Sequence, residues 1–361
     1  MSAAEARLTV DLDALAHNYA ALRVAARGAE VAGVVKADGY GLGAAPVARR
    51  LRREGARSFF VARVGEGEAL REALGGEVDV YVLDGCPPGC ADRLARARLA
   101  PVLSSREQVA EFAAAARCAA EAWPAAIHVD TGMSRLGLRE EEAAALAGDP
   151  HALQHLKVEL VMSHYACADE PDHPMNRGQA DAFAAVRALF PGARASLENS
   201  GGVFGAYGAP DDLVRPGISM FGGGPFGTPD ARLRPVAILE APILQVRTVR
   251  AGETVGYSAN FTAERELRVG VLALGYADGV LRASSPRGAV WFEGARRPIL
   301  GRVSMDLTAV DLTGCAVGQA GDTAEVFGAN LPLDEAAAAA GTIAYELLVR
   351  LSPRAERIYV G

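Results

Sequence analysis

A single lysine stands where an apolar run meets a glycine-rich turn. Lys36 directly follows the apolar residues 31–35, and glycines occupy positions 39, 41 and 43. At the end of a buried strand, low polarity lowers the pKa of a lysine ammonium group and makes the free amine available for Schiff-base chemistry. The glycines let a backbone or phosphate group approach closely. Taken alone, such a stretch is more often a solvated strand end, so its interpretation depends on residues further along the chain.

Other residues whose side chains or backbone could bind a ligand lie just after predicted strands or within the last of them. They are Arg135 after residues 125–130, His164 after 158–163, Asn199 and Ser200 after 193–197, and Arg215, Gly217 and Ile218 within 213–220. Singly, a histidine here would be a core residue and an arginine a solvated loop residue. Together with Lys36 they provide an amine, an imidazole, two guanidinium groups and a small-residue phosphate cradle. This set matches what pyridoxal phosphate requires of a protein.

Eight predicted strands alternate with helical segments in the first part of the chain. The strands are expected near residues 31–36, 58–62, 78–83, 100–103, 125–130, 158–163, 193–197 and 213–220. This alternation predicts a (β/α)8 TIM-type barrel, in which the C-terminal ends of the strands meet at one rim and carry the chemistry. A doubly wound open sheet is the alternative, but no G-x-G-x-x-G motif follows the first strand.

A change of pattern near residues 234–235 indicates a second, mostly β domain. Strands are expected at 242–249, 267–274, 289–292, 298–303, 307–311 and 324–327, and helices only at 334–340 and 344–351. The predicted domains are therefore a pyridoxal-phosphate-binding barrel at 9–235 and a C-terminal β domain at 236–361, which residues 1–8 would join. Before the barrel, residues 7–12 predict a strand, and Asp13 is the expected N-cap of a helix at 14–26.

Composition narrows the class of protein further. The net charge is −7 and no basic cluster is present, which argues against a nucleic-acid partner. The N-terminus lacks the apolar core of a signal peptide, and no apolar run could span a bilayer. The five cysteines are odd in number and scattered, as expected of reduced thiols in the cytoplasm. Cys86 and Cys90 have no second pair to complete a metal site, so no metal is expected.

The chain resembles the bacterial alanine racemases over nearly its whole length. The matching segments are residues 34–43, 128–137, 163–170, 199–202, 214–221, 255–262, 274–281 and 301–306. The resemblance implies a pyridoxal 5'-phosphate-dependent enzyme that interconverts L-alanine and D-alanine and supplies D-alanine for peptidoglycan. It also implies a homodimer in which the two subunits share each active site, and the features above lead us to expect a cytoplasmic location.

The resemblance assigns a role to each candidate residue. Lys36 would hold the cofactor as an imine, Tyr40, Ser200, Gly217 and Ile218 would bind its phosphate, and Asn199 and His164 would lie beside it. Arg215 would face the pyridine nitrogen, and Arg135 would reach the cofactor's phenolic oxygen and the substrate carboxylate. Tyr257 matches the second catalytic base, and Met305 matches the residue whose backbone holds the substrate carboxylate. In the family, both come from the partner subunit.

These roles are chemically consistent. Racemisation needs an acid/base group on each face of the planar α-carbon, and Lys36 and Tyr257 would be those groups. A tyrosine with an unperturbed pKa near 10 is a poor base, so Arg215 and His164 would have to assist it. Because guanidinium is effectively never deprotonated, Arg215 favours an unprotonated ring nitrogen. That weakens the electron sink and should suppress transamination.

Two departures from the family pattern affect the supporting residues. Many members carry a lysine, carbamylated to support the arginine, where this chain has His128. Many also carry a phosphate-binding tyrosine where this chain has Pro353, with Tyr359 nearby. We expect Arg135 to be held instead by another anion, a nearby carboxylate or a neutral hydrogen bond.

Other functions remain open at the level of the sequence. A broad-specificity or serine racemase would share every motif, because the size of the pocket cannot be read from them. A same-fold amino-acid decarboxylase would carry an acidic residue at the ring nitrogen, and Arg215 argues against it. A non-catalytic pyridoxal-phosphate carrier would not need Tyr257 or the second domain.

Overall fold

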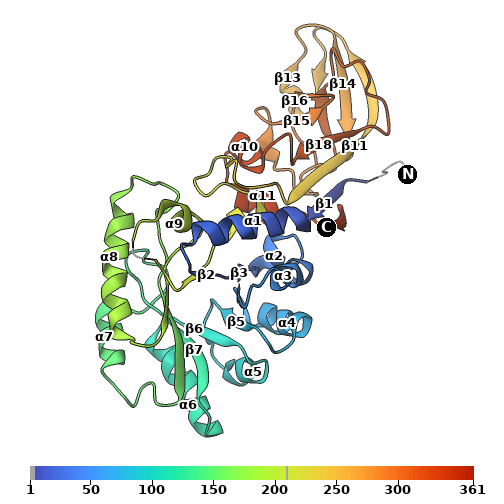
Figure 1. The fold of residues 1–361 in the computed structure, drawn as a ribbon. Helices are drawn as coiled ribbons and strands as arrows, with labels where there is room; N and C mark the ends of the chain where they lie inside the picture. Colours follow the sequence, from blue (N-terminus) through green and yellow to red (C-terminus); the bar gives the residue numbers. More distant parts are fainter. Residues whose placement is uncertain (1–4, 209) are drawn as a thin grey trace. The chain divides into compact units, whose positions relative to one another are not determined.

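The computed structural model describes residues 5–208 and 210–361. The chain forms two compact units (Figure 1). The barrel unit is Tyr19–Met220, and the β unit combines the residues up to Asn18 with Phe221–Gly361. Helix α1 (Leu12–Ala25) passes from one unit to the other. Among the described residues, none of the helices has the length and apolar character needed to cross a membrane.

Parallel strands in sequence order form the barrel unit. The seven-stranded sheet comprises β3 (Gly33–Val34), β4 (Ser58–Val61), β5 (Asp79–Val82), β6 (Ala100–Leu103), β7 (Trp123–His128), β8 (Leu156–Met162) and β9 (Arg194–Ser196). The two-residue strand β10 (Leu213–Val214) pairs with β2 (Glu30–Val31), which only Ala32 separates from β3. On its other side, the backbone N–H of Asp212 donates to Ala195 and that of Arg215 to Glu198, beside β9. The predicted (β/α)8 barrel is therefore confirmed.

Helices follow the strands and surround them (Figure 1). They are α2 (Lys36–Tyr40), α3 (Ala44–Arg53), α4 (Val64–Leu74), α5 (Ala91–Arg96), α6 (Arg106–Ala119), α7 (Glu140–Ala147), α8 (Pro174–Leu189) and α9 (Ser200–Gly205). The strands read as continuous apolar runs because both of their faces are covered. Phe59, Phe60 and Tyr81 are fully buried in them, and the rings of Phe60 and Tyr81 stack with centroids 4.8 Å apart.

Two local predictions were wrong. The last barrel strand was expected at residues 213–220, but β10 ends at Val214 and a 3-10 turn, η1 (Ile218–Phe221), follows. Pro216 has no backbone N–H to donate to a strand ladder, which explains the early end. At the first helix, Asp11 rather than Asp13 is the cap, since Asp11 Oδ1 accepts a hydrogen bond from the N–H of Ala14 at 2.8 Å.

An eight-stranded sheet in the order β14-β17-β16-β15-β18-β11-β1-β19 forms the β unit. The strands are β1 (Arg7–Asp11), β11 (Ala237–Val249), β14 (Leu267–Leu272), β15 (Ala289–Phe292), β16 (Ala295–Leu300), β17 (Thr308–Asp311), β18 (Thr323–Phe327) and β19 (Glu356–Val360). Strand β11 also pairs with β14. Between these two strands in the chain, β12 (Thr254–Val255) and β13 (Phe261–Thr262) form an antiparallel hairpin. The predicted helices are found as α10 (Leu333–Ala339) and α11 (Ala344–Val349).

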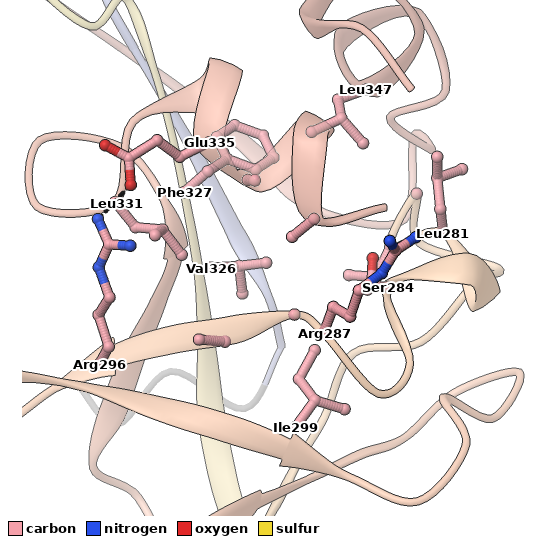
Figure 2. Close-up of a pocket in the computed structure, with 16 residues that line it drawn as sticks. Leu281, Ser284, Arg287, Arg296, Ile299, Val326, Phe327, Leu331, Glu335 and Leu347 are labelled. Carbon is pink, nitrogen blue, oxygen red and sulfur yellow. Dashed lines mark hydrogen bonds and ion pairs between the residues drawn. The ribbon is translucent and has the colours of Figure 1, made fainter. Parts of the chain in front are cut away.

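A small apolar cavity lies inside the β unit, between helices α10 and α11 and strands β15, β16 and β18 (Figure 2). An ion pair between Arg296 and Glu335 joins β16 to α10 at one side of it. Its volume is about 80 Å³. An apolar cavity that binds benzene measures about 150 Å³. Because none of the candidate site residues lines it, we regard this cavity as a packing gap.

Candidate active site

Lys36 lies at the C-terminal end of the first barrel strand and opens the short helix α2. The four residues after it, 37–40, all have positive φ angles, of 53°, 54°, 63° and 58°. Only one of them is glycine, and left-handed backbone costs other residues roughly 1–2 kcal/mol each. The turn places Lys36 and Tyr40 in fixed relation to each other.

Side-chain carboxylates stabilise this strained turn. Asp38 Oδ1 accepts a hydrogen bond from the N–H of Ala44 at 2.8 Å, which fixes the turn to helix α3. Glu66 Oε1 accepts one from the N–H of Ala37 at 2.9 Å, and its Oε2 accepts one from Ala62 at 2.8 Å. Glu66 therefore links the turn that follows Lys36 to the loop between β4 and α4.

The surroundings of Lys36 favour its neutral amine. Burial lowers the pKa of the Lys36 ammonium group, and the positive charges of Arg135 and Arg215 lower the pKa further. The carboxylates of Glu66 and Asp84 act in the opposite direction but do not reverse the shift. A lysine with a lowered pKa is a better nucleophile and proton acceptor near neutral pH.

Arg215 is buried at the same rim. Its Nη2 donates to the carbonyl oxygen of Ser163 at 2.6 Å and lies 3.2 Å from Nδ1 of His164, while Nη1 donates to Ser196 Oγ. Since guanidinium can only donate, Nδ1 of His164 accepts and its ring proton is on Nε2. Burial lowers the pKa of Arg215 to about 10, so it remains a cation at neutral pH. Its Nε has no hydrogen-bond partner among the described residues.

Both histidines of the rim are held neutral. Burial, Arg215, Arg135 and Lys36 lower the pKa of His164 well below its ordinary value. Burial and Arg215 lower the pKa of His128 to about 4, and Ser104 Oγ lies 3.4 Å from its Nδ1. The positive charge of the rim therefore lies on Arg135 and Arg215 rather than on the histidines, which suits an anionic ligand.

Arg135 is exposed on the loop after β7, and the backbone of this loop is well fixed. The Asp130 carboxylate accepts hydrogen bonds from the N–H groups of Gly132, Met133 and Ser134, at 2.8–3.1 Å. No residue in the described part of the chain forms a hydrogen bond or ion pair with the Arg135 side chain itself. The anion or hydrogen bond expected to support this guanidinium is therefore not supplied by these residues.

A cradle of hydroxyl groups and small residues lies between the last two strands. Ser200 Oγ accepts hydrogen bonds from the N–H groups of Gly217 at 3.1 Å and Ser219 at 3.3 Å. Tyr40 is buried so closely against Gly217 that a Cβ on that glycine would lie 2.0 Å from the tyrosine Oη. Asn199 caps helix α9, its Oδ1 accepting from Gly202 N–H at 3.0 Å. Hydroxyl donors beside a residue that tolerates no side chain fit a phosphate group.

Some residues of the site had not been predicted. The predicted Ile218 lies buried at the start of η1, next to Gly217 of the cradle. The residue after it, Ser219, was not predicted and carries a fully buried hydroxyl without a partner among the described residues. Ser219 follows Ile218 directly and could have been found as a further hydroxyl in the small-residue segment. Glu66 and Gln179 leave no pattern in the sequence, because their partners are backbone groups far away in the chain. Gln179, on helix α8, donates to the carbonyl oxygen of His164.

Tyr257 and Met305 belong to the β unit. Tyr257 opens a 3-10 turn, η2 (Tyr257–Ala259), between β12 and β13, and 69% of it is exposed. Met305 is 54% exposed, and its carbonyl oxygen accepts a hydrogen bond from the N–H of Ala277 at 2.9 Å. Tyr359 lies in β19, where it is paired with Val10 of β1. The β unit thus presents the two predicted residues on its surface.

The fold and the rim together define a class of protein. This is a barrel enzyme with an activated lysine and a phosphate cradle at the C-terminal ends of its strands, followed by a β domain. The model of the alanine racemase N-terminal domain matches residues 10–225, and that of the alanine racemase C-terminal domain matches residues 236–359. The chain belongs to the alanine racemase family.

Individual relatives agree with this assignment. A catabolic alanine racemase of Mesorhizobium japonicum is 47% identical over 100% of this chain and 94% of its own length. An alanine racemase of a Methylobacterium species is 46% identical over 98% of both chains. The crystal structure of alanine racemase from Bartonella henselae, with covalently bound pyridoxal phosphate, has a TM-score of 0.94 at 36% identity, covering 99% of this chain and 100% of its own.

Proposed function

We propose that the protein is a pyridoxal-phosphate-dependent alanine racemase that interconverts L-alanine and D-alanine by a two-base mechanism. One observation carries the proposal: a partly buried lysine with a lowered pKa shares a rim with two arginines and a hydroxyl-lined cradle. The family membership and the cofactor in the relative from Bartonella henselae support the same function.

The residues of the rim fit the cofactor. Lys36 would hold it covalently, and Tyr40, Ser200 and the backbone of Gly217 and Ile218 would bind its phosphate. The free Nε–H of Arg215 is the donor available for the ring nitrogen, with His164 and Asn199 beside it. When bound, pyridoxal phosphate supplies the electron sink that makes the α-hydrogen of alanine acidic.

Proton transfer is the task of the protein's own groups. The Lys36 amine would accept or deliver the α-proton on one face of the substrate, and the Tyr257 hydroxyl would do so on the other. Arg135 and the backbone of Met305 would hold the substrate carboxylate. The Arg215 cation would oppose protonation of the ring nitrogen. The cofactor would then be a weaker electron sink, which should suppress transamination in favour of proton exchange.

We further propose that the active form is a homodimer with shared sites. Within one chain, Tyr257 and Met305 are largely exposed, as expected of residues that complete the site of a partner.

The proposed domain boundaries are residues 9–235 for the barrel domain and residues 236–361 for the β domain, which the start of the chain would join. Strand β1 supports the last point, because it pairs with β11 and β19 of the β unit. A cytoplasmic location is proposed from the five free cysteines.

The physiological direction is proposed to be supply of D-alanine for peptidoglycan. The two enantiomers have equal free energy in water, so the enzyme alone cannot set a direction. Relatives are named both catabolic and biosynthetic, from Mesorhizobium japonicum and Pseudomonas aeruginosa respectively. D-alanine dependence of a deletion strain would support the supply role, whereas failure to grow on D-alanine as a carbon source would indicate the catabolic one.

The direct test is to incubate the protein with pyridoxal phosphate and L-alanine and to measure D-alanine. L-serine and other small amino acids run in parallel distinguish a serine or broad-specificity racemase, and release of carbon dioxide would reveal a decarboxylase. Borohydride should fix the cofactor on Lys36, and Lys36→Ala is the control. No D-amino acid from any substrate, with the cofactor still fixed at Lys36, would indicate a non-catalytic carrier.

A further inference from the structure

Gln179 is a fully buried amide on helix α8, outside the barrel strands. Its Oε1 accepts a hydrogen bond from the N–H of Ala166 at 2.8 Å. Its Nε2 donates to the carbonyl oxygen of His164 at 2.9 Å and lies 3.5 Å from Oγ1 of Thr131. One side chain of the helix thus contacts both the loop after β7 and the end of β8.

Thr131 extends these contacts towards Arg215. Its Oγ1 lies 2.7 Å from Oγ of Ser163, and the carbonyl oxygen of Ser163 accepts from Arg215 Nη2 at 2.6 Å. Thr131, Ser163 and Gln179 are all buried. A connected set of hydrogen bonds therefore runs from helix α8 through the rim to the guanidinium group proposed to face the cofactor.

The loop of Arg135 depends on such support. The Arg135 side chain has no hydrogen-bond or ion-pair partner among residues 5–208 and 210–361, and the buried imidazole of His128 is neutral. The position of the guanidinium group is then set by the backbone of its loop. Thr131 is a buried polar residue of that loop, and the methylene groups of Gln179 also approach Gly132, where an added Cβ would lie 3.7 Å from Cγ.

We propose that Gln179 is a positioning residue that fixes Arg135 through the Thr131 loop, and His164 and Arg215 through the end of β8. The proposal rests on the proposed function, since it assumes that Arg135 holds the substrate carboxylate. An amide is required because only Asn and Gln side chains combine an acceptor with two donors. A carboxylate could not donate to His164, and an apolar residue would leave its carbonyl group and the Ala166 N–H unpaired.

The test compares Gln179→Met with a matched control on the same helix, Asn176→Met. Asn176 is equally buried, and its Nδ2 donates to the carbonyl oxygen of Glu170 at 2.9 Å. Both changes exchange a buried amide for an unbranched apolar chain. The first measurement is kcat and KM for L-alanine, and the second is hydrogen–deuterium exchange at residues 132–134 in the cofactor-free protein.

Gln179→Met is expected to raise the KM for L-alanine by about tenfold or more, because small misplacements of a binding group cost up to about 100-fold. Exchange at residues 132–134 should accelerate, while Asn176→Met changes neither quantity. An unchanged KM and unchanged exchange in Gln179→Met would overturn the proposal. So would equal effects in both variants, since these would indicate general destabilisation.

Thr131→Val interrupts the same contacts from the other side. It should also raise the KM for L-alanine. The KM of the double variant should be no higher than that of the worse single variant, because the effects of coupled residues are not additive. Additive losses would contradict the proposal, and Thr131→Val decides it alone if Gln179→Met does not fold. If the wild-type protein makes no D-alanine, the proposed function fails, but the exchange measurement still decides whether Gln179 orders the loop.

Discussion

Arg215 forms hydrogen bonds to several groups of the rim, and its charge lowers the pKa of Lys36 and of both histidines. Its guanidinium group is buried, and its hydrogen bonds go to the Ser163 carbonyl oxygen, the Ser196 hydroxyl and the His164 imidazole. These acceptors compensate a buried cation without neutralising it. The retained charge lowers the pKa of Lys36, His128 and His164 together. A single substitution at position 215 would therefore alter the pKa of all three groups.

The first prediction concerns the direction of proton transfer. Tyr257→Phe keeps the aromatic ring and removes the proton-transfer group, so racemisation should fall by about 10²–10⁴-fold in both directions. By the family resemblance, Lys36 handles the proton of the D-isomer. Exchange of the α-hydrogen of D-alanine with deuterated solvent should therefore persist, while exchange from L-alanine falls far more. Equal losses from both isomers would mean that Tyr257 is structural or that one base serves both faces.

The second prediction concerns stability against acid. The pKa of His128 is about 4 in the folded protein and near 6.5 when unfolded, so the unfolded chain binds the proton first. Above pH 7, His128 is neutral in both states and has almost no effect on the free energy of unfolding. As the pH falls from about 6.5 to 4, the unfolded chain binds the proton and the fold is progressively destabilised. His128→Gln should lose up to about 2 kcal/mol less stability between pH 7 and 5 than the wild type. Thermal unfolding of both proteins at several pH values measures this, and parallel curves would contradict it.

The sequence was informative where a residue's chemistry coincided with its place on a strand. Lys36, His164 and Arg215 stand at strand ends and could be singled out without any resemblance. Tyr257 could not, because a tyrosine in a β-rich segment is ordinarily a strand aromatic. Gln179 was missed for another reason: it contacts backbone groups far away in the chain, and such contacts have no local pattern.

At the scale of elements, the turn after Lys36 has a strained backbone that contacts with distant residues stabilise. Left-handed backbone at Ala37, Asp38 and Tyr40 would cost several kcal/mol in an isolated peptide, at roughly 1–2 kcal/mol per residue. Glu66 and the packing of Tyr40 on Gly217 offset this cost. The glycines indicated a turn, but its handedness at three other residues is dictated by tertiary contacts and could not be foreseen. Strand β10 is a different case: it was predicted too long, although Pro216, which cannot donate to a strand ladder, could have indicated its early end.

The third prediction uses the cavity of the β unit (Figure 2). Ala336 on α10 lines this cavity of about 80 Å³, whereas Ala338 on the same helix is exposed. Leucine at 336 would bury three more carbon atoms in existing space, and cavity filling commonly adds about 0.5–2 kcal/mol. Ala336→Leu should therefore raise the melting temperature relative to Ala338→Leu, which has the same change in helix propensity. A lower melting temperature would show that the cavity cannot accept the side chain.

For the molecule as a whole, the groups proposed for catalysis are divided between the two units. Lys36, Arg135 and Arg215 belong to the barrel unit, while Tyr257 and Met305 are exposed on the β unit. Large exposed apolar residues on the β unit also include Tyr276 and Leu307, next to the Met305 segment. Clusters of this kind are typical of surfaces that contact another protein.

The last prediction follows from the proposal that two copies of the chain share each site. Lys36→Ala and Tyr257→Ala should each be inactive, because each lacks one of the two bases. After subunit exchange of an equal mixture, about half of the dimers are mixed, and each mixed dimer holds one intact site out of two. The mixture should therefore recover about one quarter of the wild-type activity.

The control for this experiment is a chain that carries both substitutions. Mixed with Lys36→Ala, it should recover nothing, because no pairing then combines Lys36 with Tyr257. If both bases of a site came from one chain, the Lys36→Ala and Tyr257→Ala proteins would also stay inactive together, since every chain would lack one base. Demonstrated subunit exchange without recovery would thus place Lys36 and Tyr257 of each site on a single chain and remove the need for the dimer in catalysis.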